Sequence, residues 1–329
     1  MNSPGEHIFF SDIHTVEQFN ESALKCFRFQ SEHNPVYRQY LRLLNFDSQK
    51  VEAISDIPFL PIEFYKTHRV YAGDQPEEAR FLSSGTTGVQ PSIHYVAKVS
   101  WYIHSFSLGF NFFYGKPDEF CFLALLPSYL ERKDSSLVYM LDDLIKKSKF
   151  PESGFYLNDL EGLSHSLKVL EERGIKTILL GVSYALLDLA NNYPVHLKNT
   201  IVVETGGMKG RREELSKDEL HRRLRNAFMV ENIHSEYGMT ELLSQAYSKG
   251  QGLFESPPWM KIMIRDPYDP FKYLENGRSG GINIIDLANW YSCSFIETQD
   301  LGRQHDKEGF EILGRFDNSD IRGCNLLVQ

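Results

Sequence analysis

The 329-residue sequence predicts an α/β protein with mixed, mostly parallel sheets, flanking helices and a smaller β subdomain near the C-terminus. Two observations predict this fold class. Between about residues 81 and 240, short apolar runs alternate with segments of helical spacing. Between residues 259 and 316, successive β-like runs are separated by glycine, proline and aspartate turns, which is typical of a mainly antiparallel unit.

Composition places the chain among ordinary globular proteins. Hydrophobic residues make up 42% of the sequence and charged residues 24%, so a sizeable core is expected. The formal net charge of −9 argues against a general nucleic-acid or anionic-membrane binder. No apolar stretch reaches the ~20 residues of a membrane span, and the first residues lack the pattern of a secretory signal. We therefore expect a cytoplasmic protein with no nucleic-acid partner and no membrane span.

The elements are expected in the following order. Residues 15–45 have helical spacing with a break near Asn34-Pro35, and residues 57–66 look like a packed, proline-punctuated connector. Ser216 and Glu219 form a capping-box pattern at the start of the last helix of the alternating region. Buried strands are expected at residues 119–127, 175–181, 199–207 and 231–238. Helices are expected at residues 100–114, 134–147, 163–174 and 216–228.

A cluster of hydroxyls and glycines follows the short apolar run at Phe81. Glycines let a backbone approach a ligand, and consecutive N–H groups form an anion-binding concavity. The cluster lacks the lysine of a GxxxxGK[ST] loop, which excludes a P-loop on sequence. A phosphate-binding loop and an ordinary Ser/Thr/Gly turn both fit this pattern. The residues concerned are Ser83, Ser84, Gly85, Thr86, Thr87 and Gly88.

A second polar cluster follows a predicted strand that ends at Tyr237-Gly238. Thr240 offers a hydroxyl and Glu241 a carboxylate directly after it. Ligands of open α/β sheets bind outside the carboxyl ends of the strands. A carboxylate there is a candidate ligand for Mg²⁺, which proteins hold through one or two carboxylates together with substrate phosphates. The alternative is that Glu241 is a solvated residue in the first turn of a helix.

Two further segments resemble ligand-binding turns. Gly206 and Gly207 again follow a predicted strand. Asp300 and Arg315 are predicted at strand ends, where an aspartate can accept hydrogen bonds from sugar hydroxyls and an arginine can donate to sugar or phosphate. Both residues also fit ordinary turns.

Taken in order, these loops resemble those of the adenylate-forming superfamily, which includes acyl- and aryl-CoA ligases, luciferases and the adenylation domains of peptide synthetases. The resemblance covers roughly residues 81–323. It implies that the Ser/Thr/Gly loop wraps the triphosphate of ATP. It also implies that Tyr237 packs on adenine, Thr240 meets the α-phosphate and Glu241 binds Mg²⁺.

The same resemblance assigns the other two segments. It implies that Gly206 and Gly207 line the adenine and acyl pocket, and that Asp300 and Arg315 contact the ribose. The large ligases continue past this point into a C-terminal lid domain with a catalytic lysine, which we expect to be absent here. We expect the chain to consist of three consecutive segments. They are an N-terminal helical segment over residues 1–80 packed on the core, a nucleotide- and acyl-binding α/β part over residues 81–258, and a β-rich subdomain over residues 259–329.

The chain most resembles the acyl-protein synthetase (LuxE-like) branch of this superfamily, which uses a cysteine near the C-terminus as acyl acceptor. Cys324 stands at that place. Cys26, Cys121 and Cys293 have no metal-ligand spacing and are expected to be small buried residues. The alternative is that Cys324 is an inert residue of the C-terminal tail.

The resemblance implies an AMP-forming acid–thiol ligase that needs ATP and Mg²⁺. Its substrate is expected to be a carboxylic acid, with a fatty acid as the family expectation. The acyl group is expected to pass to Cys324 as a thioester and then to an acyl-accepting protein such as a reductase. Three alternatives remain open at this point: an acyl- or aryl-AMP ligase that delivers to CoA or another carrier, a non-catalytic nucleotide-binding module, and an interaction domain without a ligand.

Overall fold

The computed structural model describes residues 9–84, 90–127, 134–206, 215–305 and 309–316. The chain divides into two compact units, and the first is assembled from both ends of the sequence. The first unit holds Met1–Tyr102, Glu241–Ser244 and Glu255–Gln329, and the second holds Ile103–Thr240 and Gln245–Phe254. The segments expected from the sequence, residues 1–80, 81–258 and 259–329, describe the order along the chain. The two units group residues by spatial contact instead, and the three-segment division stays a proposal.

Two helices open the first unit, as the sequence predicts. Helix α1 (Val16–His33) begins at Thr15, whose side chain accepts from the Gln18 N–H while the Gln18 side chain accepts from the Thr15 N–H. Helix α2 (Pro35–Leu43) begins at Asn34, which caps it through the Tyr37 N–H, with proline in the first helical position. The break near Asn34-Pro35 is therefore confirmed.

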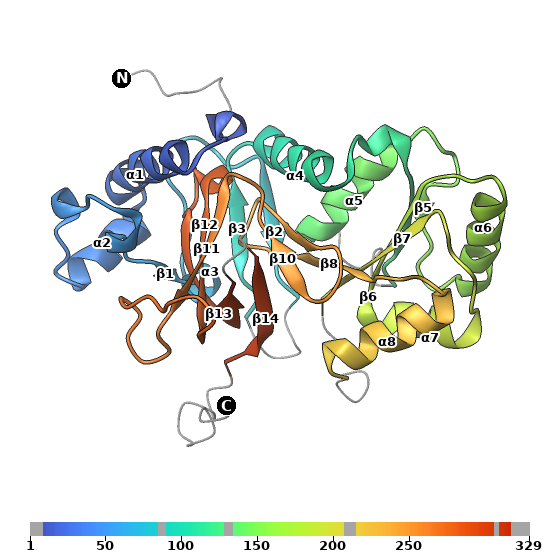
Figure 1. Ribbon diagram of the computed structural model, residues 1–329. Helices are drawn as coiled ribbons and strands as arrows, with labels where there is room; N and C mark the ends of the chain where they lie inside the picture. Colours follow the sequence, from blue (N-terminus) through green and yellow to red (C-terminus); the bar gives the residue numbers. More distant parts are fainter. Residues whose placement is uncertain (1–8, 85–89, 128–133, 207–214, 306–308, 317–329) are drawn as a thin grey trace. The chain divides into compact units, whose positions relative to one another are not determined.

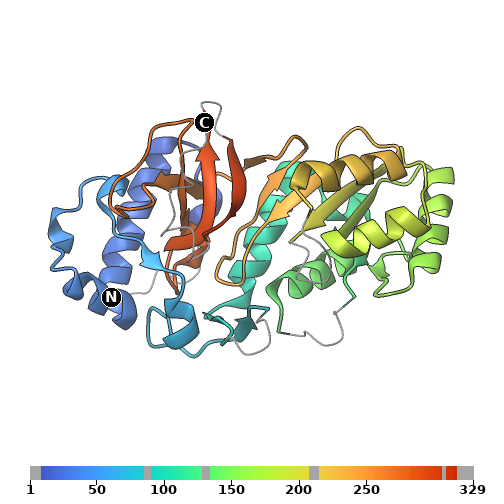
Figure 2. The same ribbon diagram turned by 90° about the horizontal axis from the view of Figure 1, so that it is seen from below.

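An antiparallel sheet forms the centre of the first unit (Figures 1 and 2). Its strands pair in chain order, β11 with β12, β12 with β13 and β13 with β14, and the short β1 runs parallel to β13. A separate hairpin pairs β2 with β3. The bounds are β1 Leu60–Pro61, β2 Ala79–Leu82, β3 Ile93–Val96, β11 Met260–Arg265, β12 Ser279–Asp286, β13 Phe295–Gln304 and β14 Phe310–Arg315.

Short helices connect these elements. The predicted connector of residues 57–66 contains β1 and the start of α3 (Phe64–Thr67). A 3₁₀ turn, η6 (Leu287–Asn289), follows β12 directly. The other 3₁₀ turns of this unit are η1 Phe9–Asp12, η2 Ser48–Lys50 and η3 Ile54–Asp56.

The second unit contains the predicted parallel sheet, in the order β9-β8-β7-β6-β4-β5. Strands β5, β4, β6, β7 and β8 are parallel, and β9 is antiparallel to β8. Every residue of β4 and β6 is buried, which explains their continuous apolar sequences. The bounds are β4 Cys121–Leu125, β5 Gly154–Phe155, β6 Thr177–Val182, β7 Thr200–Thr205, β8 His234–Tyr237 and β9 Ala246–Ser248.

Helices of the second unit flank this sheet, and α7 packs against α8 (Figure 1). Helix α7 was not predicted, because it follows β6 directly without a loop and is similarly apolar. The bounds are η4 Pro117–Glu119, α5 Ser136–Lys147, α6 Leu160–Glu172, α7 Ser183–Asn192 and α8 Lys217–Phe228. Helix α4 (Val99–Tyr114) and strand β10 (Leu253–Glu255) contain two of the points at which the chain passes between the units, and the other two lie on either side of Glu241–Ser244.

Candidate active site

The Ser/Thr/Gly loop is closed at its base by two serines of the first unit. The Ser83 N–H donates to the Ser92 carbonyl at 3.0 Å, and the Ser92 N–H donates to Ser83 Oγ at 2.8 Å. These bonds extend the β2–β3 hairpin by one further pair, and Ser84 is exposed directly after it. The remaining predicted members of the loop lie outside the described residues: Gly85, Thr86, Thr87 and Gly88.

Glu241 is connected to the base of this loop. Its side chain is 5% exposed and is hydrogen-bonded to the side chain of Ser92. Burial raises the pKa of the carboxyl, and the Ser92 hydrogen bond and the charges of Arg315 and Lys66 offset this rise in part. Ser92 thus bridges Ser83 and Glu241. The sequence reasoning missed Ser92, since a serine that follows a proline carries no functional signal of its own.

Asp300 and Arg315 face one another across a strand pair of the first unit. They are directly opposed in the β13–β14 ladder, and Arg315 Nε donates to Asp300 Oδ1 at 3.2 Å. The Asp300 residue is 8% exposed, whereas the Arg315 side chain is 76% exposed and directed to the surface. The prediction that Asp300 ends a strand is wrong. The strand β13 continues to Gln304 because β14 pairs with it over that length.

The glycine segment and the Tyr237 segment occupy the ends of neighbouring parallel strands in the second unit. Gly206 follows β7 with φ of 70°, a conformation that favours glycine, and its carbonyl accepts from Ser183 Oγ at 2.5 Å. Tyr237 ends β8, is 9% exposed, and its ring lies 6.0 Å from that of Phe254. Gly207 lies outside the described residues.

Gly238 and Thr240 continue the chain from β8 toward Glu241. A Cβ atom on Gly238 would lie 2.5 Å from Glu236 Oε1, so the glycine leaves the room that this carboxyl occupies. Thr240 is half-buried and is the last residue of its segment in the second unit, immediately before Glu241 in the first. The first unit therefore groups Ser83, Ser84, Glu241, Asp300 and Arg315, and the second groups Gly206, Tyr237, Gly238 and Thr240.

A buried acidic network that the sequence did not predict surrounds the end of β7. Glu204 is 6% exposed, lies 3.2 Å from Lys217 Nζ and accepts from Ser183 Oγ at 3.2 Å. Burial opposes ionisation of Glu204, but hydrogen bonds from His221 and Ser235 and the charge of Lys217 bring its pKa down to about 2. The network thus stabilises the charged form of Glu204 near the end of the apolar strand β7. In the sequence, the only sign of this network is one glutamate in the apolar run "IVVETGG".

The pKa of a second carboxyl in this region, that of Glu236, is raised rather than lowered. Glu236 Oε2 accepts from Thr205 Oγ1 at 2.5 Å across the β7–β8 pair. Although part of the side chain reaches the surface, burial of the carboxyl raises the pKa of Glu236 to about 7, with a further rise from the charge of Glu204. Two neighbouring glutamates therefore titrate far apart.

The three cysteines in the described part of the chain are buried, as predicted. Burial raises the pKa of Cys121 to about 11 and that of Cys293 to about 12, and it raises the pKa of Cys26 further still. Thiols of this kind are poor nucleophiles. Cys324 lies outside the described residues.

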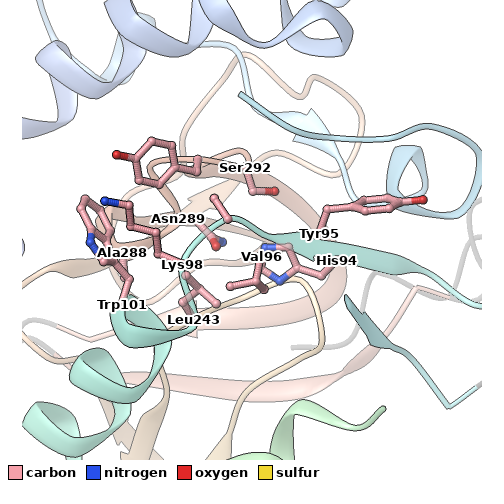
Figure 3. Close-up of a pocket in the computed structure, with 11 residues that line it drawn as sticks. His94, Tyr95, Val96, Lys98, Trp101, Leu243, Ala288, Asn289 and Ser292 are labelled. Atoms are coloured by element: carbon pink, nitrogen blue, oxygen red, sulfur yellow. The ribbon is translucent and has the colours of Figure 1, made fainter. Parts of the chain in front are cut away.

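A small cavity in the first unit is lined in part by Leu243, two residues after Glu241 (Figure 3). His94 and Val96 of β3, Leu243, and Asn289 and Ser292 after β12 contribute to its lining. Its volume of about 10 Å³ suits a single water molecule, so it is not a pocket for an acid or a nucleotide.

The described residues contain no group of three or more His, Cys, Asp or Glu side chains placed to hold a metal ion. Among the described helices, none is both long and apolar enough to cross a membrane.

Comparisons with known proteins place these features in a wider group. Residues 7–141 match the family model "Acyl-protein synthetase, LuxE". A comparison with curated proteins returned no match. Among solved structures, ATP-bound MatB from Rhodopseudomonas palustris is 19% identical with a TM-score of 0.55, over 74% of this chain and 49% of MatB. An ATP-bound RpMatB-BxBclM chimera gives the same values.

A second solved structure covers more of the chain. An open conformation of 2-hydroxyisobutyryl-CoA ligase, in complex with 2-HIB-AMP and CoA, is 12% identical with a TM-score of 0.66. The match covers 97% of this chain and 75% of the ligase. The chain spans about half the length of the MatB chains. It has the fold of the adenylate-forming ligases, and over residues 7–141 it is similar to their acyl-protein synthetase branch.

Proposed function

We propose that the protein activates a carboxylic acid with ATP to an acyl adenylate, and then passes the acyl group to the thiol of Cys324. The observation that carries the proposal is the hydrogen-bonded series of Ser83, Ser92 and Glu241. It joins the base of the Ser/Thr/Gly loop to a buried carboxylate. The likeness of residues 7–141 to acyl-protein synthetases supports a protein cysteine as the acceptor.

In this proposal, the loop supplies neutral donors for the triphosphate. The bonds between Ser83 and Ser92 join the strands on either side of it. Consecutive backbone N–H groups and hydroxyls of a Ser/Thr/Gly loop are suited to bind phosphate oxygens. In this proposal, Thr240 donates its hydroxyl to the α-phosphate.

Glu241 fits the role of a Mg²⁺ ligand. Its buried carboxyl has a raised pKa because the surrounding protein gives too little compensation for a charge. A divalent cation supplies that compensation and neutralises phosphate charge when it is bound. Ser92 orients the carboxylate by hydrogen bonding, and it thereby fixes the direction in which the ligand oxygen points.

Activation is an in-line displacement at phosphorus. A carboxylate oxygen of the acid attacks the α-phosphorus of ATP, the bond from this phosphorus to the bridging oxygen breaks, and pyrophosphate leaves. Asp300 and Arg315 are assigned to the ribose. Asp300 accepts a hydrogen bond from Arg315 Nε, and the exposed terminal nitrogens of the same guanidinium are assigned to the ligand. The proposed substrate is a fatty acid.

Transfer requires an accessible thiolate. Cys26, Cys121 and Cys293 are excluded by burial and by raised pKa values. The thiolate of Cys324, after loss of its proton to solvent, attacks the acyl carbonyl carbon, and AMP leaves with the bonding electrons of the anhydride. The acyl thioester then passes to a protein partner, with a reductase as the proposed acceptor.

A second candidate is delivery of the acyl group to CoA. The likeness to 2-hydroxyisobutyryl-CoA ligase over 97% of this chain favours it. In this case Cys324 has no role in the reaction, and free CoA replaces it as the attacking thiol.

One experiment separates these functions. Wild type and Cys324→Ser are incubated with ATP, Mg²⁺ and labelled carboxylic acids, with and without CoA. Label that stays on denatured wild type, is released by neutral hydroxylamine and is missing from Cys324→Ser supports the acyl-protein synthetase. Label that appears in CoA, equally with both proteins, supports the CoA ligase. ATP binding without acid-dependent pyrophosphate exchange would contradict both and leave a nucleotide-binding module.

A further inference from the structure

A hydrogen-bonded turn holds the segment that contains Glu241. The turn runs from Asp286, the last residue of β12, through η6 to Asn289, and is called the 286–289 turn below. Asp286 Oδ2 accepts from the N–H groups of Leu243 and Ser244 at 2.9 and 3.0 Å. Asp286 Oδ1 accepts from Ser244 Oγ at 2.6 Å, so this carboxylate fixes two consecutive residues that follow Glu241.

Asn289 reaches Glu241 itself. Its Nδ2 donates to the backbone carbonyl of Glu241 at 2.8 Å, and the Asn289 residue is 1% exposed. The backbone of Asn289 is held in turn by the buried Gln30 of α1, whose Nε2 donates to its carbonyl at 2.9 Å. The amide of Asn289 therefore connects Glu241 to the core of the first unit.

The side chain of Asn289 also lines the small cavity described above. Asn289 Oδ1 is buried and has no hydrogen-bond partner among the described residues. The cavity has room for a single water molecule that can donate a hydrogen bond to this oxygen. Figure 3 shows the Asn289 side chain at the small cavity next to Leu243 and Val96.

We propose that the 286–289 turn, through the Asn289 amide, positions the backbone of Glu241 so that its carboxylate is preorganised for a divalent cation that accompanies ATP. Asn289 is a positioning residue and does not touch the ligand. The inference rests on the proposed nucleotide site. Its physical basis is that a ligand carboxylate with a fixed main chain and a fixed hydrogen bond from Ser92 loses little freedom when the cation binds.

The test uses the full chain and measures binding rather than turnover. ATP binding is titrated by calorimetry at a series of Mg²⁺ concentrations and in EDTA. Asn289→Leu removes the donor, and Asn289→Asp keeps the shape but replaces the donor by an acceptor. Asn34→Leu is the control, because Asn34 is also fully buried and its amide is hydrogen-bonded to the Ser292 carbonyl and the Tyr37 N–H rather than to Glu241. Thermal unfolding first confirms that each variant is folded at the assay temperature.

The expected result is a rise of about 10-fold in the Mg²⁺ concentration for half-maximal ATP binding in both Asn289 variants. ATP binding in EDTA is expected to stay at the wild-type value, and Asn34→Leu is expected to keep the wild-type Mg²⁺ dependence. A wild-type Mg²⁺ dependence in the Asn289 variants, or an equal shift in Asn34→Leu, would overturn the inference alone. Failure of the wild type to bind ATP with Mg²⁺ would overturn the proposed function together with it.

Discussion

At the scale of single residues, burial disfavours the charged forms of two glutamates, Glu241 and Glu236. Glu241 is buried beside Ser92, and Glu236 is desolvated beside Thr205. Burial is the largest cause of the raised pKa in both cases. The difference is that Glu241 has the positive charges of Arg315 and Lys66 within electrostatic reach, whereas Glu236 has the negative charge of Glu204.

Glu241→Gln tests the proposed cation ligand. We expect acid-dependent exchange of pyrophosphate into ATP to fall by roughly 100-fold, since charge stabilisation at the phosphates is lost. The melting temperature is expected to stay the same or rise slightly, because a neutral amide is cheaper to bury than this carboxylate. Glu275→Gln, at an exposed position of the same unit, is the control. Full exchange activity in Glu241→Gln would rule out its assigned role.

Glu236 predicts a pH dependence of stability. Its folded-state pKa of about 7 lies above the ordinary value of 4.5, so the folded protein binds this proton more tightly than the unfolded chain does. The stabilisation is complete below pH 4.5 and is lost as the pH rises through about 7, by about 3 kcal/mol in all. The low pKa of Glu204, about 2, places its own transition outside this window.

Denaturant unfolding of wild type and Glu236→Gln between about pH 5 and pH 8 measures this effect. The wild type is expected to lose stability across the range, and the variant to lose much less because glutamine does not titrate. Parallel pH profiles for the two proteins would show that Glu236 does not cause the change.

At the scale of elements, the turn between β12 and β13 organises the chain around Glu241. Asp286 is fully buried and accepts four hydrogen bonds, from Leu243 N, Ser244 N, Ser244 Oγ and Ala288 N. Trp259 Nε1 donates to the same Ser244 hydroxyl at 2.9 Å. Asp286 is more than 40 residues away in the sequence from Leu243 and Ser244, the residues that it holds. The segment after Thr240 is therefore fixed by long-range contacts.

Asp286→Ala is expected to destabilise the protein by about 3 kcal/mol, because the buried N–H groups of Leu243 and Ser244 lose their acceptor. Asp286→Asn keeps one acceptor oxygen and removes a buried charge, so its loss is expected to be smaller. Chemical denaturation of the three proteins gives these free energies of unfolding. A loss below about 1 kcal/mol for Asp286→Ala would mean that the segment is held by its other contacts.

At the scale of the whole molecule, the first unit is built from sequence segments that lie far apart. Phe27 of α1 is fully buried, and its ring lies 6.1 Å from those of Tyr37 and Phe295. Cys26 Sγ and Ser294 Oγ lie 3.1 Å apart in the same region. The N-terminal helices are thus part of the core that carries β13, rather than an addition to it.

Phe27→Ala is expected to cost about 3–5 kcal/mol of stability, since it leaves a cavity where both ends of the sequence meet. Phe271→Ala, at a residue that is 54% exposed, is expected to change stability by less than about 0.5 kcal/mol. Thermal and denaturant unfolding of both variants give the comparison. Similar losses for the two would contradict the position of Phe27 in the core.

The local sequence determined much of this protein. The alternation of strands and helices predicted the parallel sheet, and glycines after strands indicated the candidate ligand loops. The side chains of Thr15 and Asn34 specify where two helices begin. These features depend on hydrogen bonds and burial patterns within a few residues, so they can be predicted from one stretch of chain. Helix α7 and the mid-strand position of Asp300 were missed, because an apolar run does not show where a strand ends.

The tertiary structure alone decided how the candidate site is supported. Ser92, Asp286 and Asn289 carry no motif, yet they hold Ser83, the residues after Glu241 and the Glu241 carbonyl. Their partners are set by which strands and turns meet in the folded first unit, and hydrogen bonds at that range leave no periodicity in the sequence. The sequence by itself therefore identified the groups suited to the chemistry, whereas long-range packing determined which of them are buried, oriented and charged.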